Sequence, residues 1–195
     1  MSRFLRELEI PEKPERYILY QGAVNEGRSF DTLIPAMLDV PARLLIAGDG
    51  NYMERVRVLI KNHGLEEKVI LLGRVTPKEL RDITRKAWAG VTLFEYKGKS
   101  NYFSLANRYF DYMHAGIPQL CVDYPVYREL NNSGAVALLT SDLQPASLAA
   151  GLNRLLTDQA LYKSLQTNCL SKRNVLNWQT EEKTLLKIYQ HLFES

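Results

Sequence analysis

The sequence predicts an α/β fold, a doubly wound parallel sheet of about six strands that is closed by helices at its C-terminal end. The first observation behind this prediction is that short apolar runs alternate with helical segments of roughly ten to fifteen residues, which is typical of parallel βαβ units. The second is that these runs are apolar nearly throughout, as expected of strands buried on both faces. Such a Rossmann-like sheet binds its ligands at the carboxyl ends of the strands.

The first half of the chain supplies three strands and three helices in alternation. Pro35 is expected to kink or shorten the first helix. Gly64 fits the C-cap of the second helix, and Thr76 followed by Pro77 is a strong start signal for the third. The predicted strands are 17–22, 42–50 and 68–73, and the predicted helices are 28–38, 52–64 and 76–87.

The second half of the chain continues the alternation and then becomes helical. One aromatic helix is expected from about Ser104 to Ala115, because the pattern stops at the turn residues Gly116 and Pro118. From Pro145 onward the pattern is helical only. The predicted strands are 90–95, 118–123 and 134–139, and the C-terminal helices are 145–158, 159–173 and 178–193.

Length and composition limit the domain organisation. The 195 residues suffice for one core, which we place in a single domain over 17–195. Residues 1–16 are charged and contain two prolines, so they are expected to form a linker or leader. No apolar run approaches the roughly 18 residues of a membrane span, and no signal-peptide core is visible. We therefore expect a cytoplasmic protein, with Cys121 and Cys169 as buried free thiols.

The net charge limits the kind of ligand. A formal charge of +3, spread along the chain, is too small and too scattered for a nucleic-acid binder. It suits an anionic ligand held in one basic pocket. Because no clustered His and Asp ligand set is visible, we expect no metal and no cofactor.

The loop after the first predicted strand is a candidate anion site. Its spacing, Gly22 to Gly27 to Arg28, is nearly that of a P-loop, but an arginine stands where the lysine should be. Glycines let the backbone approach an anion, and the start of a helix favours phosphate. A tight turn with a surface arginine stays open as the alternative, and a P-loop NTPase is disfavoured. After the third strand, backbone groups of Arg74 and Val75 could contact a base, or the two residues simply form a turn.

The second candidate site lies where the aromatic helix begins. The preceding connection, 95–108, is long for a βα loop, and long ordered loops tend to be functional. Free backbone N–H groups are expected from Ser104 and Leu105 to Asn107, facing the same sheet edge as the first loop. The two helix starts would then share one crevice for a nucleoside diphosphate. Tyr102 could stack on a base or a sugar, although packing against the protein is the alternative.

Polar residues inside the aromatic helix extend this second site. Arg108 and Asp111 lie on one helix face together with Asn107. An Asp111–Arg108 ion pair across one turn is the structural interpretation, worth roughly 0.3 kcal/mol. The functional interpretation is that the Asp111 carboxylate accepts hydrogen bonds from two neighbouring ribose hydroxyls. The residues alone leave both interpretations open.

The segments "YQGAVNEGR", "LLIAGDG", "KVILLGRV" and "SLANRYFDYMHAGIPQLCVDYPVYREL", with a late "NW", resemble the C-terminal half of family-4-type retaining glycosyltransferases. These enzymes have the GT-B architecture of two Rossmann-like domains, and the resemblance covers about residues 17–193. Asn107, Arg108 and Asp111 fall on the Asn, Lys and Glu of a bacterial subgroup. The resemblance implies that the acid holds the ribose of a nucleotide-sugar donor and that basic residues hold its diphosphate.

The same resemblance implies that the acceptor-binding N-terminal domain is absent from this chain, so we expect the isolated chain to be inactive as a hexosyltransferase. The catalytic residues stay unassigned, and peripheral membrane association would come through the absent half. Bacterial surface polysaccharide or glycoconjugate synthesis is the implied role. A non-catalytic nucleotide-binding module and another GT-B enzyme, such as a sugar-nucleotide epimerase, remain the alternatives.

Three departures from the family pattern affect the expected donor contacts. Phe103 stands where many relatives carry a glutamate that touches the donor sugar. Ala23 and Glu26 stand where relatives carry basic residues after the first strand, and Arg28 is expected to compensate. Asp111 is one methylene shorter than the glutamate of the subgroup.

Overall fold

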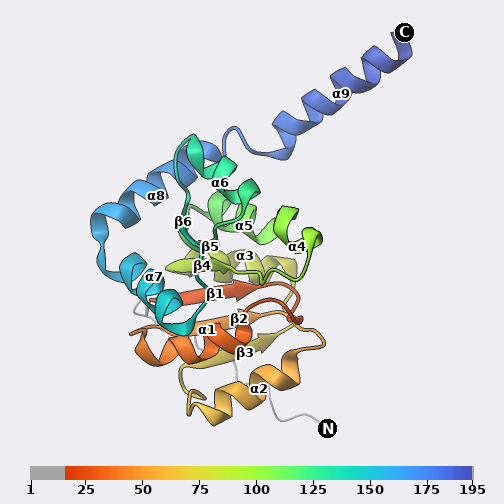
Figure 1. The fold of residues 1–195 in the computed structure, drawn as a ribbon. Helices are drawn as coiled ribbons and strands as arrows, with labels where there is room; N and C mark the ends of the chain where they lie inside the picture. The colour runs from red at the N-terminus through yellow and green to blue at the C-terminus, as the bar shows by residue number, and fades with distance from the viewer. Residues whose placement is uncertain (1–15, 195) are drawn as a thin grey trace.

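The computed structural model describes residues 16–194, so the predicted linker over 1–16 lies outside them except for its last residue. The fold is the expected one: six parallel strands in the order β3-β2-β1-β4-β5-β6, flanked by helices (Figure 1). The order reverses between β1 and β4, so the switch point of the sheet lies at the carboxyl ends of these two strands. The strands are β1 Tyr17–Gln21, β2 Arg43–Ala47, β3 Val69–Gly73, β4 Ala89–Thr92, β5 Gln119–Val122 and β6 Ala137–Thr140.

The helices cover both faces of the sheet. Alternate side chains of β1 define the two faces, because Ile18 and Tyr20 pack with α1, α2 and α7, whereas Leu19 packs with α3 and α5. The helices α5, α6 and α8 enclose a third cluster beside β5. The helices are α1 Phe30–Ala36, η1 Met37–Asp39, α2 Met53–Asn62, α3 Pro77–Lys86, α4 Lys99–Phe103, α5 Asn107–Ala115, α6 Pro125–Asn132, α7 Pro145–Thr157, α8 Gln159–Lys172 and α9 Trp178–Glu194.

Several local predictions are confirmed with small changes in the bounds. Thr76 caps α3 in a full capping box with Pro77 in the first turn. Pro35 lies inside α1, which ends one residue later and continues as a 3₁₀ turn. Cys121 and Cys169 are buried free thiols.

The predicted start of the aromatic helix is wrong. Residues 99–103 form the separate short helix α4, and Ser104 is extended, so α5 begins only at Asn107. The Tyr127 hydroxyl, which lies on α6, accepts the Ala106 N–H at 3.1 Å and fixes this later start. The helix α6 itself was not predicted from the sequence.

The loops after β1 and β2 approach each other closely at the sheet edge. Gly48 has a φ of 153°, and a Cβ atom built there would lie 1.8 Å from the carbonyl oxygen of Gly22. Gly22 in turn donates its N–H to Ala47. This contact fixes the backbone at the carboxyl end of β1, where the candidate site is built.

The helix α9 projects away from the rest of the fold (Figure 1). Several of its apolar side chains are exposed, among them Leu186, Ile188 and Phe193. Within residues 16–194, no helix combines the length and the apolar character that crossing a bilayer requires.

Candidate functional site

Two arginines converge at the carboxyl ends of β1 and β4. The guanidinium carbons of Arg28 and Arg108 lie 4.4 and 5.2 Å from the centre of the Phe94 ring, and that of Arg108 lies 4.5 Å from the centre of the Tyr20 ring. Arg108 is only 9% exposed. Nε of Arg28 and Nη1 of Arg108 are buried without a hydrogen-bond partner. The aromatic rings thus hold both cations in place, and Arg28 adds one long hydrogen bond of 3.5 Å from its Nη1 to Oδ1 of Asn101.

Neither arginine forms an ion pair with any residue of the described part of the chain. The Asp111–Arg108 ion pair that the sequence left open is therefore not formed. Burial and the positive charge of Arg108 together lower the pKa of Arg28. A buried cation without a counter-ion is costly, and such a pair favours an anionic ligand.

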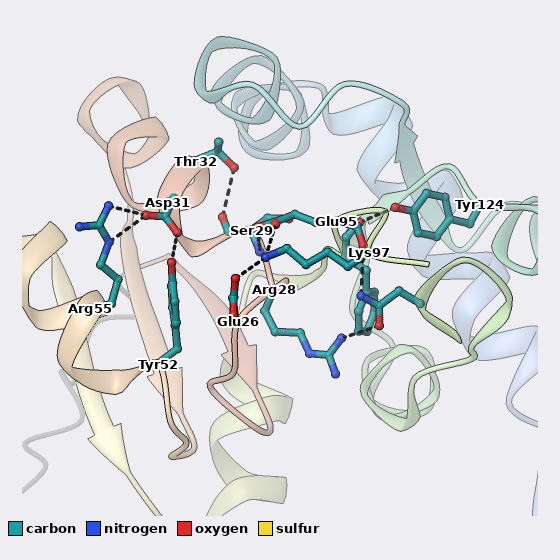
Figure 2. A network of polar contacts seen from close by, with 12 residues as sticks. Glu26, Arg28, Ser29, Asp31, Thr32, Tyr52, Arg55, Glu95, Lys97 and Tyr124 are labelled. Atoms are coloured by element: carbon teal, nitrogen blue, oxygen red, sulfur yellow. Dashed lines mark hydrogen bonds and ion pairs between the residues drawn. The ribbon is translucent and has the colours of Figure 1, made fainter. Parts of the chain in front are cut away.

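The start of α1, in contrast, is already occupied by a carboxylate. The Ser29 N–H donates to Oε1 of Glu95 at 3.2 Å. Nζ of Lys97 forms ion pairs with Oε2 of this glutamate at 3.6 Å and with Oε1 of Glu26 at 2.5 Å (Figure 2). The N–H of the N-cap residue is therefore already taken, and the phosphate contact expected at this helix start stays a prediction. Arg28 extends away from this cluster (Figure 2).

Asp111 faces a cavity of about 390 Å³ on the side of the sheet covered by α3 and α5. Its Oδ2 accepts a hydrogen bond from Nε2 of Gln21 at 2.8 Å. Burial of the carboxyl group raises the pKa of Asp111, and the Gln21 hydrogen bond and the charges of His114 and Arg108 oppose this. The residue itself is exposed on the surface of α5.

The predicted single crevice is not found. The cavity beside Asp111 is lined by neither Arg28 nor Arg108. The Arg108 side chain passes the sheet edge at Gly22, where its guanidinium carbon lies 3.9 Å from a Cβ built on that glycine. The site therefore has two parts, the arginine pair and the Asp111 cavity, which Arg108 and Asp111 connect because both lie on α5.

Gln21 and Thr84 complete the Asp111 side of the site, and neither was predicted from the sequence. Gln21 is 3% and Thr84 is 4% exposed, and the Thr84 hydroxyl lies 2.8 Å from Oε1 of Gln21. The available signal was a glutamine at the end of an otherwise apolar strand, directly before Gly22. A buried amide at this position requires polar partners.

The backbone predicted to contact the base lies at the carboxyl end of β3. Arg74 is exposed and pairs with Asp49 at 3.2 Å. Val75 is partly buried against the cluster that contains Leu19 and Tyr112. These contacts fit a βα turn, and they leave the predicted base contact untested.

The residues predicted to bind the donor near the start of α5 do not all lie in its first turn. Tyr102 packs against the rings of Tyr96, Phe103 and Tyr124, as the packing alternative predicts. Ser104 and Leu105 precede the helix, so their N–H groups do not belong to its first turn. Asn107 is exposed as the first residue of α5.

The structure offers no evident place for a metal ion among the residues that it describes. No three His, Cys, Asp or Glu side chains in this part of the chain are grouped so as to hold one. His114, the histidine beside the Asp111 cavity, contacts the carbonyl oxygen of Leu176 through Nε2 at 2.7 Å. The chemistry available at the site is therefore that of cations, one carboxylate and amides.

Comparison with known proteins agrees with this architecture. The chain is 22% identical to sucrose-phosphate synthase from Thermosynechococcus elongatus, with a TM-score of 0.78 over 92% of this chain and 46% of that one. The structure of Anabaena HepE in complex with UDP matches with a TM-score of 0.76 and 15% identity over 91% of this chain and 49% of that one. The C-terminal domain of a glycosyl transferase group 1 family protein from Francisella tularensis matches with a TM-score of 0.67 and 13% identity over 82% and 84%.

One curated relative is also similar in sequence. It is the N-acetylgalactosamine-N,N'-diacetylbacillosaminyl-diphospho-undecaprenol 4-alpha-N-acetylgalactosaminyltransferase of Campylobacter jejuni, 26% identical over 168 residues. The alignment covers 81% of this chain and 42% of that relative, so the chain spans less than half of its length. The model of the family "Glycosyl transferases group 1" matches residues 2–171. The chain therefore belongs to the glycosyl transferases group 1 family.

Proposed function

We propose that this chain binds the nucleoside-diphosphate sugar donor of a retaining glycosyltransferase, with the acceptor held by a domain outside this sequence. The observation that carries the proposal is the pair Arg28 and Arg108, one half-buried and one buried cation, each with an unsatisfied nitrogen and no carboxylate partner among the described residues. A diphosphate supplies the missing charge and hydrogen-bond acceptors, and guanidinium groups bind phosphate oxygens in pairs.

Each part of the site would take one part of the donor. As the bond between sugar and diphosphate breaks, negative charge gathers on the leaving diphosphate, and Arg28 and Arg108 would stabilise it. The Asp111 carboxylate, fixed on one side by Gln21, would accept the ribose hydroxyls with its other oxygen. No metal is required in this arrangement, because the two cations neutralise the developing charge.

The relatives support a donor of this class and suggest a biological role. HepE was solved with UDP, and the Campylobacter relative is named for transfer of a hexosamine to a lipid-linked diphosphate. We infer hexosyl transfer in bacterial surface polysaccharide or glycoconjugate synthesis. The site would then work in the cytoplasm, with peripheral membrane contact made by the acceptor half.

A binding experiment on the chain tests the diphosphate role. Thermal shift with UDP, GDP and ADP selects the nucleotide, and calorimetry then compares the diphosphate with its nucleoside. We expect Arg28→Ala and Arg108→Ala each to weaken binding of the diphosphate roughly tenfold or more, because charge-assisted hydrogen bonds contribute about 1.5–3 kcal/mol. Binding of the nucleoside should stay unchanged. Arg57→Ala on the outer helix α2 is the charge-matched control. Equal losses for both ligands would reject the phosphate role.

The role of Asp111 has a separate test. Asp111→Asn is expected to weaken the ribonucleotide more than its 2′-deoxy analogue, because the lost acceptor served the ribose hydroxyls. An equal effect on both ligands would remove ribose recognition from the proposal. Binding without sugar transfer, after fusion to the N-terminal half of a relative, would favour a nucleotide-binding module. Release of free UDP without acceptor would favour an epimerase.

A further inference from the structure

We infer that Gln21 and Thr84 are positioning residues that orient the Asp111 carboxylate for ribose recognition, an inference that rests on the proposed function. The three side chains come from three elements, β1, α3 and α5, and meet on one face of the sheet. Gln21 joins the other two, with 2.8 Å from its Nε2 to Oδ2 of Asp111 and 2.8 Å from its Oε1 to the Thr84 hydroxyl.

The geometry leaves Gln21 as the group that fixes the carboxylate. Arg108, one turn before Asp111, is the obvious partner, but its guanidinium lies over the Tyr20 and Phe94 rings instead. Oδ1 of Asp111 makes no hydrogen bond to the described residues, while Oδ2 is held by the amide. One oxygen is therefore anchored, and the other is left to accept hydrogen bonds at the 390 Å³ cavity.

Thr84 determines which end of the Gln21 amide faces Asp111. When the Thr84 hydroxyl donates to Oε1 of Gln21, the amide must present its N–H to the carboxylate. The same hydroxyl also lies 2.7 Å from the Leu80 carbonyl, but its single proton serves one acceptor at a time. If it donates to Leu80, the amide turns over, and its oxygen faces an Asp111 that must then be protonated. A donation from Thr84 to Gln21 and a hydrogen bond from Gln21 to Oδ2 of Asp111 are thus consistent with each other.

Burial makes this arrangement specific. Gln21 and Thr84 are almost fully buried and meet the cavity only at its wall, so water has little access to their polar atoms. Loss of either group leaves the carboxylate free to change rotamer on an exposed helix surface. The affinity for a ligand with both ribose hydroxyls should then fall more than the affinity for a ligand that lacks one of them.

The experiment measures the ratio of affinities for the nucleoside diphosphate selected by thermal shift and for its 2′-deoxy form. We expect the wild type to prefer the ribose form by about tenfold or more, as for one hydrogen bond to a charged acceptor. Gln21→Met and Thr84→Val are expected to bring the ratio close to one, because binding of the ribose form weakens more than binding of the 2′-deoxy form. Thr84→Ser keeps the hydroxyl and should restore the wild-type ratio.

The chain provides a matched control in a second buried glutamine–threonine pair. Gln119 is fully buried, lies 2.7 Å from the Thr92 hydroxyl and donates to the carbonyl of Tyr109, with no contact to Asp111. Gln119→Met should cost comparable stability and leave the ratio unchanged. A similar loss of the ratio in Gln119→Met would show a general packing effect and overturn the inference.

A pH profile separates positioning from mere destabilisation. Gln21→Glu places two carboxyl groups in contact, and the pair should retain one proton to higher pH. The ribose preference of this variant should therefore fall as the pH rises, whereas that of the wild type should not. An unchanged ratio in Gln21→Met and Thr84→Val, while Asp111→Asn abolishes it, would overturn this inference alone. No diphosphate binding by the wild type, or no effect of Asp111→Asn, would overturn the proposed function and this inference together.

Discussion

The buried guanidinium of Arg108 should stabilise the bound ligand at the expense of the free protein. Replacement by methionine, Arg108→Met, keeps much of the side-chain volume but removes the charge. The loss of the contacts with the Tyr20 and Phe94 rings should cost about 1–2 kcal/mol. Removal of a buried donor that lacks a partner should raise the free energy of unfolding by about 1–3 kcal/mol. The two effects roughly cancel, so the free energy of unfolding should stay within about 1 kcal/mol of the wild type or rise slightly.

Binding should respond in the opposite way. The charge-assisted hydrogen bonds to phosphate contribute about 1.5–3 kcal/mol, so the diphosphate should bind roughly ten- to a hundredfold more weakly to Arg108→Met. Urea denaturation without ligand gives the stability, and calorimetry gives the affinity. If Arg108 serves the ligand, its replacement should weaken binding and leave the stability unchanged. If it serves the fold, its replacement should lower the stability.

Arg16 offers the matched control for this prediction. Its guanidinium also stacks on a ring, at 3.9 Å from the centre of Trp88, but it donates to the carbonyl of Leu156 at 3.1 Å and is exposed. Arg16→Met should therefore lose about 0.5–1 kcal/mol of stability and leave diphosphate affinity unchanged. A loss of more than about 2 kcal/mol in Arg108→Met would refute the reasoning, because that cost matches the disruption of a satisfied buried group.

Three further outcomes are expected. Gly48→Ala should lower the free energy of unfolding by about 3 kcal/mol or more in urea denaturation, because its Cβ would lie 1.8 Å from the Gly22 carbonyl oxygen at a φ of 153°; a loss below 1 kcal/mol would contradict this close approach. Burial raises the pKa of Asp31, but hydrogen bonds from a tyrosine and an arginine outweigh burial and lower the pKa below 3.8. The ionised Asp31 therefore stabilises the folded state fully above pH 3.8, and this stabilisation is lost as the pH falls through the lowered pKa. Unfolding measured at pH 7 and pH 3 should show a smaller decline in Asp31→Asn, and an equal decline would exclude this contribution. Burial raises the pKa of Cys121 and brings that of Cys169 to about 12, so both thiols should react with a thiol reagent only after unfolding; rapid reaction of the folded chain would contradict their burial.

Local patterns in the sequence were sufficient for most of the fold. The apolar runs located all six strands, and the Thr76–Pro77 pair gave the start of α3 to within one residue. The start of α5 was missed because it depends on the Tyr127 hydroxyl, which comes from a later helix. Local propensity carries no information about such a partner.

The candidate site was predictable only in part. Arg28, Arg108 and Asp111 stood out because polar residues in an aromatic helix and at a glycine-rich turn require an explanation. Whether Arg108 would pair with Asp111 could not be decided from their spacing. The structure decided it through the Tyr20 and Phe94 rings, which hold the guanidinium elsewhere.

The sequence by itself determined the six strands and their alternation with most of the helices, the parallel sheet and the presence of cations near its carboxyl edge. These features follow from residue periodicity and turn chemistry, which act over a few neighbouring positions. Only the tertiary structure decided that Glu95 covers the start of α1 and that Gln21 holds Asp111. Those contacts join residues 66 and 90 positions apart, and the strand order alone brings them within hydrogen-bond distance.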